Sequence, residues 1–295
     1  MERSISTEAS KKAGISISEI SEYLDITKEA SKRGGEILMK HYGKLNTIKT
    51  KGREGDLVTN ADIESEKIVL GILKNAYPEI GILSEESGRE GNLEGLSWCV
   101  DPLDGTTNFA HGYPFFATSV GLTWQGLPIL GSIDIPFLNE TYFAAPGIGA
   151  FCNDKRINVS STKDLAKSLL VTGFAYDRQT RLDNNYAEFC WLTHRTRGVR
   201  RGGAAAVDLA FVASGRIDAY WERGLAPWDL AAGSAIVEIA GGLITDYCGN
   251  EFDINNGRIL ASSPGIQSAM ILELGKVKPL QGDMFGAPEI TNFGP

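Results

Sequence analysis

Two aspartates three positions apart, Asp101 and Asp104, occupy the stretch of this 295-residue chain that is richest in groups able to do chemistry. A short apolar run leads into Asp101, and Pro102 predicts that the strand ends there because proline has no N–H to donate to a sheet. The resulting turn can aim both carboxylates and the carbonyl oxygen of Leu103 at one point. Oxygen ligands of this kind suit Mg²⁺ better than Zn²⁺.

The residues that follow predict an anion site. Gly105 and Thr106 begin a predicted helix, whose free N–H groups and positive dipole end can hold an oxyanion. A cation site beside an anion site indicates a phosphate ester as the ligand. Taken alone, an Asp-x-x-Asp-Gly turn is more often a solvated loop than a metal site. Only further acidic residues elsewhere in the chain can favour the metal site.

Two further elements carry an acid at one end. Glu85 follows the apolar run 80–83, and Asp229 lies in the first turn of an otherwise apolar predicted helix. Asp229 could merely favour the helix dipole, by about 0.3–1 kcal/mol. Three predicted elements that each have an acidic residue at one end favour a shared metal site over three unrelated loops.

The elements that must position these acids alternate in type. Apolar spacing and end signals predict the helices, and short apolar runs separated by Gly, Pro and Asn predict the strands. The predicted helices are 17–42, 59 or 60 to 77, 184–193, 204–212 and 227–240; the predicted strands are 116–122, 129–135, 141–145, 150–152, 169–172 and 217–221. The class is therefore α/β or α+β, in layers.

Composition narrows the functional classes. The chain has 29 Lys and Arg against 37 Asp and Glu, a net charge of −8, which argues against a nucleic-acid surface. No apolar run reaches the roughly 18 residues of a membrane-spanning helix, and the polar first sixteen residues do not resemble a secretory signal. Four widely spaced cysteines are predicted to be reduced core thiols of a cytoplasmic protein: Cys99, Cys152, Cys190 and Cys248.

Three segments together resemble the motifs of a known family. DPLDGTTNF at 101–109, SEES at 84–87 and WDLAAG at 228–233 are similar in order and spacing to those of the inositol monophosphatase family of Mg²⁺-dependent, Li⁺-sensitive phosphatases. The resemblance implies a layered αβαβα sandwich of the inositol monophosphatase/fructose-1,6-bisphosphatase type, with mixed and antiparallel sheets, and a homodimer. It assigns 17–275 as the catalytic domain. The residue pattern separately predicts a loose N-terminal arm over 1–16, a lobe boundary near the polar stretch 153–163 and a Gly- and Pro-rich C-terminal tail over 276–295.

The resemblance also implies roles for individual residues. The metal ligands for two or three Mg²⁺ ions would be Glu85, Asp101, Asp104, Asp229 and the Leu103 carbonyl. Asp62 and Thr106 would pair to activate the attacking water, with Glu85 as a third catalytic group, and Lys51 would lie near a loosely held metal. Gly105 and Thr106 would bind the phosphoryl group. From the residues alone, Asp62 could instead be an ordinary acid at a helix start.

The substrate rim implied by the resemblance comprises Gly203, Ala204, Ala205 and Glu222, together with Asp104 and Asp229. A carboxylate such as Glu222 suits a polyol, because it accepts hydrogen bonds from vicinal hydroxyl groups. Ala204 replaces the Ser or Thr found in many relatives, which predicts one hydroxyl contact fewer. Arg201 is bulkier than the residue often found at this position. A substrate with a second anionic group is therefore an open alternative.

We therefore expect hydrolysis of a small phosphate monoester, myo-inositol monophosphate, to inositol and phosphate, with inhibition by Li⁺. The first threonine of the motif, Thr106, is followed by Thr107 and then Asn108 rather than by the Lys common in related branches, which favours inositol phosphate over histidinol phosphate or 3′-phosphoadenosine phosphate. Two alternatives remain: a broader sugar-phosphate, histidinol-phosphate or fructose-1,6-bisphosphate phosphatase, and a catalytically silent member that binds metal and anion. The complete set of acidic residues argues against the silent member. No nucleic-acid or membrane partner is expected.

Overall fold

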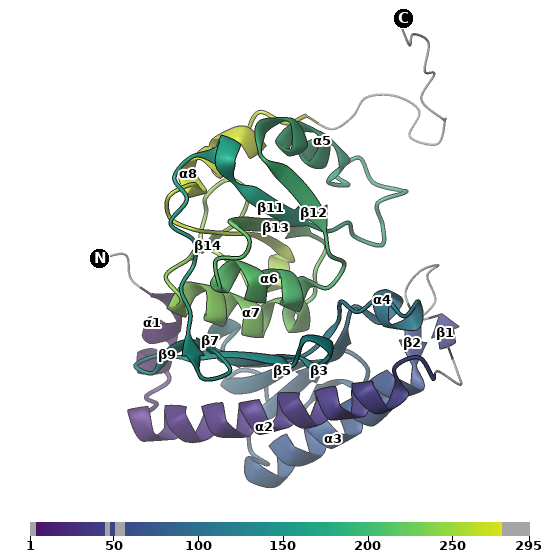
Figure 1. Ribbon diagram of the computed structural model, residues 1–295. Helices are drawn as coiled ribbons and strands as arrows, with labels where there is room; N and C mark the ends of the chain where they lie inside the picture. The colour runs from purple at the N-terminus through teal and green to yellow at the C-terminus, as the bar shows by residue number, and fades with distance from the viewer. Residues whose placement is uncertain (1–3, 45–47, 51–56, 279–295) are drawn as a thin grey trace, which may run out of the picture.

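The structure is a computed structural model that describes residues 4–44, 48–50 and 57–278. The predicted metal-proximal Lys51 and nearly all of the predicted tail lie outside these residues. Helices and sheets stack in five layers, with one pair of helices outside, a large sheet, a central helix pair, a small sheet and a second outer helix pair (Figure 1).

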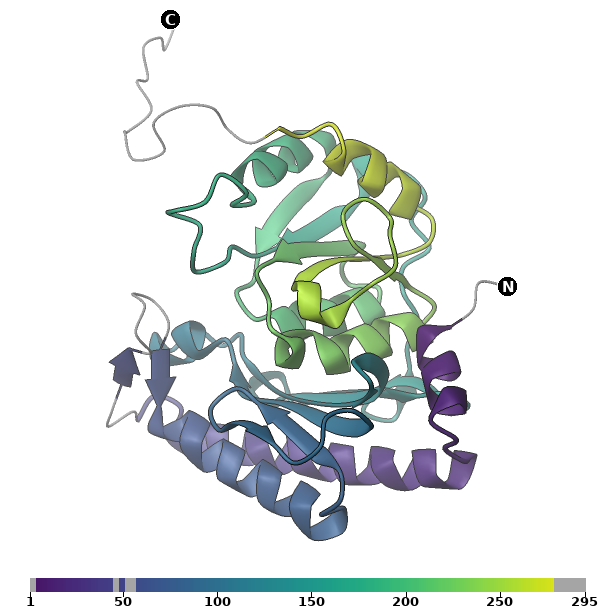
Figure 2. The same ribbon diagram turned by 180° about the vertical axis from the view of Figure 1, so that it is seen from behind.

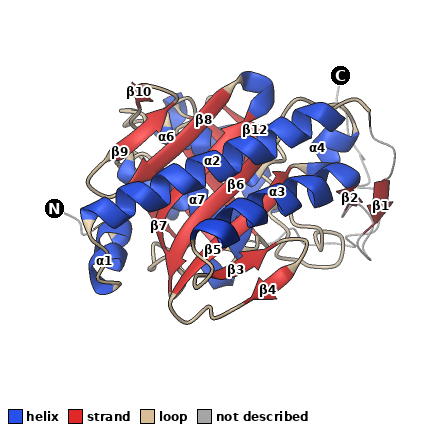
Figure 3. Ribbon diagram, turned by 90° about the horizontal axis from the view of Figure 1, so that it is seen from below, coloured by secondary structure: helices blue, strands red, loops and turns tan. Residues whose placement is uncertain are grey.

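Two long helices form the first layer, α2 (Ile17–His41) and α3 (Asn60–Ala76). Each begins with a capping box, in which Ser16 pairs with Glu19 and Thr59 pairs with Asp62. Both helices lie across the same face of the large sheet (Figure 3). The predicted bounds of both helices are confirmed to within one residue.

The large sheet has eight strands among the described residues and is antiparallel except where β3 pairs with β5. Its strands, in spatial order, are β10 (Lys155–Arg156), β9 (Gly149–Cys152), β8 (Glu140–Ala145), β7 (Leu127–Ile135), β6 (Ala117–Trp124), β5 (Leu96–Asp104), β3 (Gly81–Ser84) and β4 (Gly88–Glu90). A separate hairpin pairs β1 (Ile48–Thr50) with β2 (Leu57–Thr59).

The prediction that Pro102 ends its strand is wrong. Strand β5 continues to Asp104, and the ladder to β6 shifts register between Asp101 and Asp104. A bulge accommodates the missing N–H of Pro102. The Pro102 carbonyl oxygen accepts hydrogen bonds from the Ser65 hydroxyl (2.9 Å) and the Thr118 hydroxyl (3.1 Å).

The central layer consists of α6 (Ala205–Ala213) and α7 (Pro227–Ile239). Helix α7 is buried on all sides from residue 230 to residue 237, because a sheet lies on each side of this layer. A Cβ on Gly131 of β7 would lie 2.4 Å from the Cα of Ala232, so glycine there permits close packing of helix on sheet. The apolar sequence of this helix predicts that Trp228 is buried too, but Trp228 is half-exposed.

The small sheet is mixed and contains five strands in the described part of the chain. In spatial order these are β12 (Gly198–Arg201), β11 (Leu169–Thr172), β13 (Ala219–Arg223), β15 (Arg258–Ser262) and β14 (Leu243–Thr245). Helices α5 (Tyr186–Arg195) and α8 (Gln267–Leu274) lie on its outer side (Figure 1). Residues 157–168 connect the two sheets and overlap the predicted lobe boundary at 153–163.

Two details differ from the expectations. The N-terminal segment is not a loose arm: α1 (Ile5–Lys12) packs against β7 and α7 (Figure 2). The Glu238 carboxylate accepts hydrogen bonds from the Ser6 N–H (2.9 Å) and hydroxyl (2.6 Å). The four cysteines are free, but two of them, Cys190 and Cys248, are exposed rather than in the core. Over the described residues, no helix has the length and apolar character to cross a bilayer.

Candidate active site

Three elements bring the predicted acids together at one end of the large sheet. Strands β3 and β5 are parallel neighbours with Ser84 opposite Val100, so Glu85, which directly follows β3, lies beside Asp101 of β5. The Glu85 N–H donates to the Val100 carbonyl oxygen at 3.1 Å. Asp229 reaches the same place from the first turn of α7, in the layer above.

These acids lie close enough for the charge of one to shift the pKa of another. Burial raises the pKa of Asp101 well above its usual value, and the charges of Glu85, Asp104 and Asp229 add to the shift. Burial and the charges of Asp104 and Glu85 likewise raise the pKa of Asp229 well above its usual value. Such mutual repulsion stabilises the protonated forms, and a bound cation would relieve it.

Backbone N–H groups orient each of three carboxylates. Asp101 accepts from the Leu103 N–H at 3.0 Å, and Asp229 accepts from the Ala226 N–H at 2.7 Å. Asp104 accepts from the N–H groups of Ala205 (3.2 Å) and Ala206 (2.7 Å), which begin α6. Burial raises the pKa of Asp104 to about 7 even though these N–H groups favour its charged form.

The donor set suits a hard divalent cation. Within the described ranges, no three Asp, Glu, His or Cys side chains already surround a common metal position. The charges of Glu85 and Asp104 nevertheless raise the pKa of both Asp101 and Asp229, and all donor atoms of the four acids are oxygens, which Mg²⁺ prefers as ligands. The four carboxylates therefore fit Mg²⁺ in charge and ligand type.

The predicted pair of Asp62 and Thr106 is in contact. The Thr106 hydroxyl lies 3.1 Å from Asp62 Oδ1 and 3.0 Å from the Leu103 carbonyl oxygen, and its single proton can serve one of them at a time. The other carboxylate oxygen of Asp62 accepts from the Thr59 N–H (2.8 Å) and hydroxyl (2.6 Å). Asp62 is thus a helix-capping acid, as one interpretation had it, and also the partner of Thr106.

Gly105 connects β5 to the short helix α4 (Thr106–Ala110). Its φ of 86° lies in the left-handed region, and a Cβ would come within 2.9 Å of the Phe115 carbonyl oxygen. Glycine is therefore required for the sharp turn that directs the first N–H groups of α4 away from the strand. The predicted helix start at this position is confirmed.

The predicted substrate rim comes from the small sheet and α6. Glu222 in β13 is buried and accepts from the Tyr220 hydroxyl at 2.7 Å; burial raises its pKa to about 7. Ala204 is also buried, and it precedes α6 next to Gly105. Ala205, which was expected to face the substrate, uses its N–H to hold Asp104.

Asn108 was missing from the predicted site. Its amide nitrogen lies within hydrogen-bonding distance of the carbonyl oxygens of Phe115 (2.7 Å), Gly202 (3.1 Å) and Gly203 (3.3 Å). It therefore connects α4 to the loop that precedes α6. Its place within the 101–109 motif was the available signal, which had been used only to compare substrates.

Asp208 of α6 was also missed. It is 2% exposed, and burial together with the charges of Glu222 and Asp104 raises its pKa well above the usual value. A Cβ on Gly202 would lie 2.3 Å from Asp208 Oδ1, so this carboxyl group lies directly behind the rim. An acid in the middle of an apolar helix sequence was the signal that could have found it.

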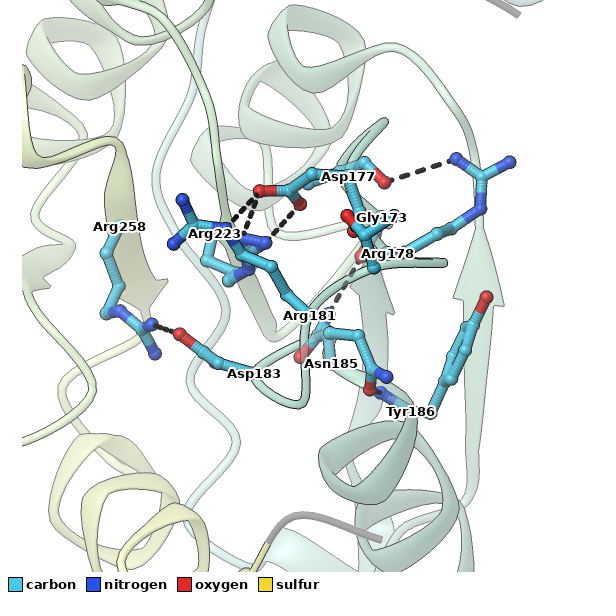
Figure 4. Close-up of polar contacts among 12 residues, drawn as sticks. Gly173, Asp177, Arg178, Arg181, Asp183, Asn185, Tyr186, Arg223 and Arg258 are labelled. Atoms are coloured by element: carbon cyan, nitrogen blue, oxygen red, sulfur yellow. Dashed lines mark hydrogen bonds and ion pairs between the residues drawn. The ribbon is translucent and has the colours of Figure 1, made fainter. Parts of the chain in front are cut away.

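The loop between β11 and α5, residues 173–185, is tied to the end of β13 beside Glu222 (Figure 4). Asp177 pairs with the buried Arg223 (3.2 Å to Nη1) and with Arg181 (3.0 Å). At the other end of the loop, Asn185 donates to the Gly173 carbonyl oxygen at 2.8 Å. The loop 173–185 thus lies beside the predicted substrate rim, which the sequence did not predict.

Comparison with known proteins agrees with this arrangement. The sequence model of the inositol monophosphatase family matches residues 19–277. An inositol-1-monophosphatase of Synechocystis sp. is 49% identical over 89% of this chain and 92% of its own length. A Nus factor SuhB of Pseudomonas aeruginosa is 40% identical over 84% of this chain and 94% of its own length.

The solved structure of an inositol monophosphatase from Anabaena (Nostoc) sp. superposes with a TM-score of 0.81 at 47% identity, covering 88% of this chain and 98% of that one. The layered fold expected from the motifs is thereby confirmed. The chain belongs to the inositol monophosphatase family.

Proposed function

We propose that this protein is a Mg²⁺-dependent phosphomonoesterase that hydrolyses myo-inositol monophosphate to inositol and phosphate. Family membership makes it a phosphatase. The observation that carries the proposal is that Glu85, Asp101, Asp104 and Asp229 lie close enough to repel one another. A bound cation would relieve that repulsion.

The metal would be held by these four carboxylates and the Leu103 carbonyl oxygen, as two or three Mg²⁺ ions. When bound, Mg²⁺ acts as a Lewis acid that lowers the pKa of water and neutralises charge on phosphoryl oxygens. The chain would supply orientation: the N–H groups of Gly105 and Thr106 would bind the phosphoryl oxygens, and the Thr106 hydroxyl would orient the attacking water. Asp62, within 3.1 Å of that hydroxyl, can draw its proton away.

The rim would select the alcohol half of the substrate. Glu222 can accept hydrogen bonds from adjacent ring hydroxyls, and Gly203 and Ala204 line the same side. Selectivity for a polyol over a plain ester would come from these hydrogen bonds, which a substrate without hydroxyl groups cannot donate. The protein would act on small molecules in the cytoplasm, as a homodimer, and would be inhibited by Li⁺.

The test is phosphate release with Mg²⁺ from inositol 1-phosphate, fructose 1,6-bisphosphate, histidinol phosphate and 3′-phosphoadenosine phosphate. A preference of a hundredfold or more in kcat/KM for inositol 1-phosphate, about 2.7 kcal/mol, supports the specific function. Near-equal values would instead make it a general sugar-phosphate phosphatase. Removal of Mg²⁺ by a chelator should abolish release from every substrate, and millimolar Li⁺ should inhibit it.

Asp104→Asn separates catalysis from folding. Loss of a ligand charge should lower kcat at least a hundredfold, while circular dichroism shows an intact fold. Asp154→Asn, in an exposed turn, is the matched control and should leave kcat unchanged. Ordinary turnover by Asp104→Asn would rule out the metal assignment, and no turnover by the unmodified chain on any substrate would favour a silent family member.

A further inference from the structure

Glu66 of α3 is a buried carboxylate with no role in the proposed reaction. It is 8% exposed, and it lies one helical turn after Asp62. One of its oxygens, Oε1, accepts hydrogen bonds from the Ser84 hydroxyl, the Glu86 N–H (3.2 Å), the Ser87 N–H (3.0 Å) and the Ser87 hydroxyl (3.2 Å). The Ser84 hydroxyl belongs to the last residue of β3, and the other three donors belong to the turn that joins β3 to β4.

That turn carries Glu85, which is flanked by residues bound to Glu66. Glu85 adds to the raised pKa of Asp101 and of Asp229, so its charge lies close to theirs. Repulsion from these acids favours movement of Glu85 away from the site. A turn held by four hydrogen bonds resists that movement, and the fold keeps Glu85 in place before a cation arrives.

The neighbouring residues of α3 show the same pattern. Ser65 donates to the Pro102 carbonyl oxygen at 2.9 Å, within the segment that carries Asp101 and Asp104, and Asp62 lies 3.1 Å from the Thr106 hydroxyl. Positions 62, 65 and 66 are spaced i, i+3 and i+4 and so share one face of the helix. That face contacts three separate parts of the active site.

We propose that Glu66 is a positioning residue that fixes the turn bearing Glu85 and thereby sets the affinity of the site for Mg²⁺. The inference rests on the proposed metal-dependent function. Glu66 touches neither substrate nor reacting atoms, so its removal should weaken metal binding while leaving the chemistry available at high metal concentration.

The experiment is isothermal titration calorimetry of Mg²⁺ into the full chain without substrate, for Glu66→Ala, Glu66→Gln and Glu64→Ala. Glu66→Ala should raise the Kd for Mg²⁺ at least tenfold and speed amide hydrogen exchange at residues 84–88. Glu66→Gln should stay within threefold of the unmodified chain, because its amide oxygen can accept the same hydrogen bonds. Glu64→Ala is the matched control on the exposed face of α3, where Glu64 pairs with His41, and should leave the Kd unchanged.

The activity of Glu66→Ala should return to within threefold of the normal kcat when Mg²⁺ is saturating. A role in stability alone would lower Tm with an unchanged Kd, and an unchanged Kd in folded Glu66→Ala overturns the proposal. If Glu66→Ala does not fold, Glu66→Asp, which withdraws the carboxylate from the turn, decides by the same criterion. Absence of Mg²⁺ binding by the unmodified chain would instead contradict the proposed function.

Discussion

The hydroxyl oxygen of Thr106 lies 3.1 Å from Oδ1 of Asp62, which joins the start of α4 to the start of α3 across 44 positions of sequence. The same carboxylate caps α3 through Thr59. The position of Asp62 is therefore fixed by local helix-capping geometry, and that position is then available to a residue from another motif.

The contact predicts a difference between two substitutions of Thr106. Thr106→Val keeps the shape but removes the hydroxyl, so kcat should fall at least a hundredfold, on the scale of general acid–base effects. Thr106→Ser keeps the hydroxyl and should stay within tenfold of the normal kcat. Steady-state assays at saturating Mg²⁺ check this, and a near-normal kcat for Thr106→Val would show that Thr106 does not orient the water.

Glu222 should discriminate between substrates. Glu222→Gln removes a charged acceptor, and a hydrogen bond to a charged group contributes about 1.5–3 kcal/mol. We expect kcat/KM for inositol 1-phosphate to fall about ten- to a hundredfold, while kcat/KM for phenyl phosphate, which lacks ring hydroxyls, changes less than threefold. Equal losses on both substrates would mean that Glu222 acts on the reaction rather than on the alcohol.

Asp134, which lies outside the active site, should make the stability of the fold depend on pH. It lies in β7 beside α2, accepts from the Thr141 hydroxyl at 2.7 Å and faces Lys32 and Glu36. Burial raises its pKa from 3.8 to about 6, so the folded state favours the protonated form. The associated stability is fully present below pH 3.8 and is lost as the pH rises through about 6.

Asp134→Asn should remove this dependence. The variant should match the unmodified chain near pH 4 and gain up to about 3 kcal/mol in the free energy of unfolding above pH 7, since each pKa unit corresponds to about 1.4 kcal/mol. Urea titrations at several pH values between 4 and 8 measure the difference. Parallel pH curves for the two proteins would contradict the assignment of the shift to Asp134.

Asp177 should control the order of the loop 173–185. Its partner Arg223 has a side chain that is 7% exposed, so Asp177→Asn leaves a buried guanidinium with a weaker acceptor, at a cost of about 1–3 kcal/mol. We expect faster amide hydrogen exchange in 173–185 and a raised KM with little change in kcat. Asp183→Asn, which removes the more exposed pair with Arg258, is the control and should have a smaller effect. Unchanged exchange in Asp177→Asn would show that other contacts hold the loop.

Local sequence determined the two long helices and predicted which acids form the site. Capping residues and apolar spacing act over a few residues, so they located α2 and α3 to within one residue. The 101–109 motif joins its carboxylates and its helix start within one turn, so the resemblance identified both the acids and Gly105. The bulge at Asp101–Asp104 depends on the neighbouring strand β6 and on hydroxyl groups from α3 and β6, so the sequence around Pro102 alone predicts the end of a strand that in fact continues.

Contacts between distant segments were decided by the tertiary structure alone. Parallel pairing of β3 with β5 sets Glu85 beside Asp101, the start of α6 orients Asp104, and Glu66 holds the turn at 84–87. Burial of α1 and of every side of α7 depends likewise on neighbouring layers. The physical reason is that each such contact joins residues many positions apart. The periodicity and composition of one segment do not specify which distant residue it will contact.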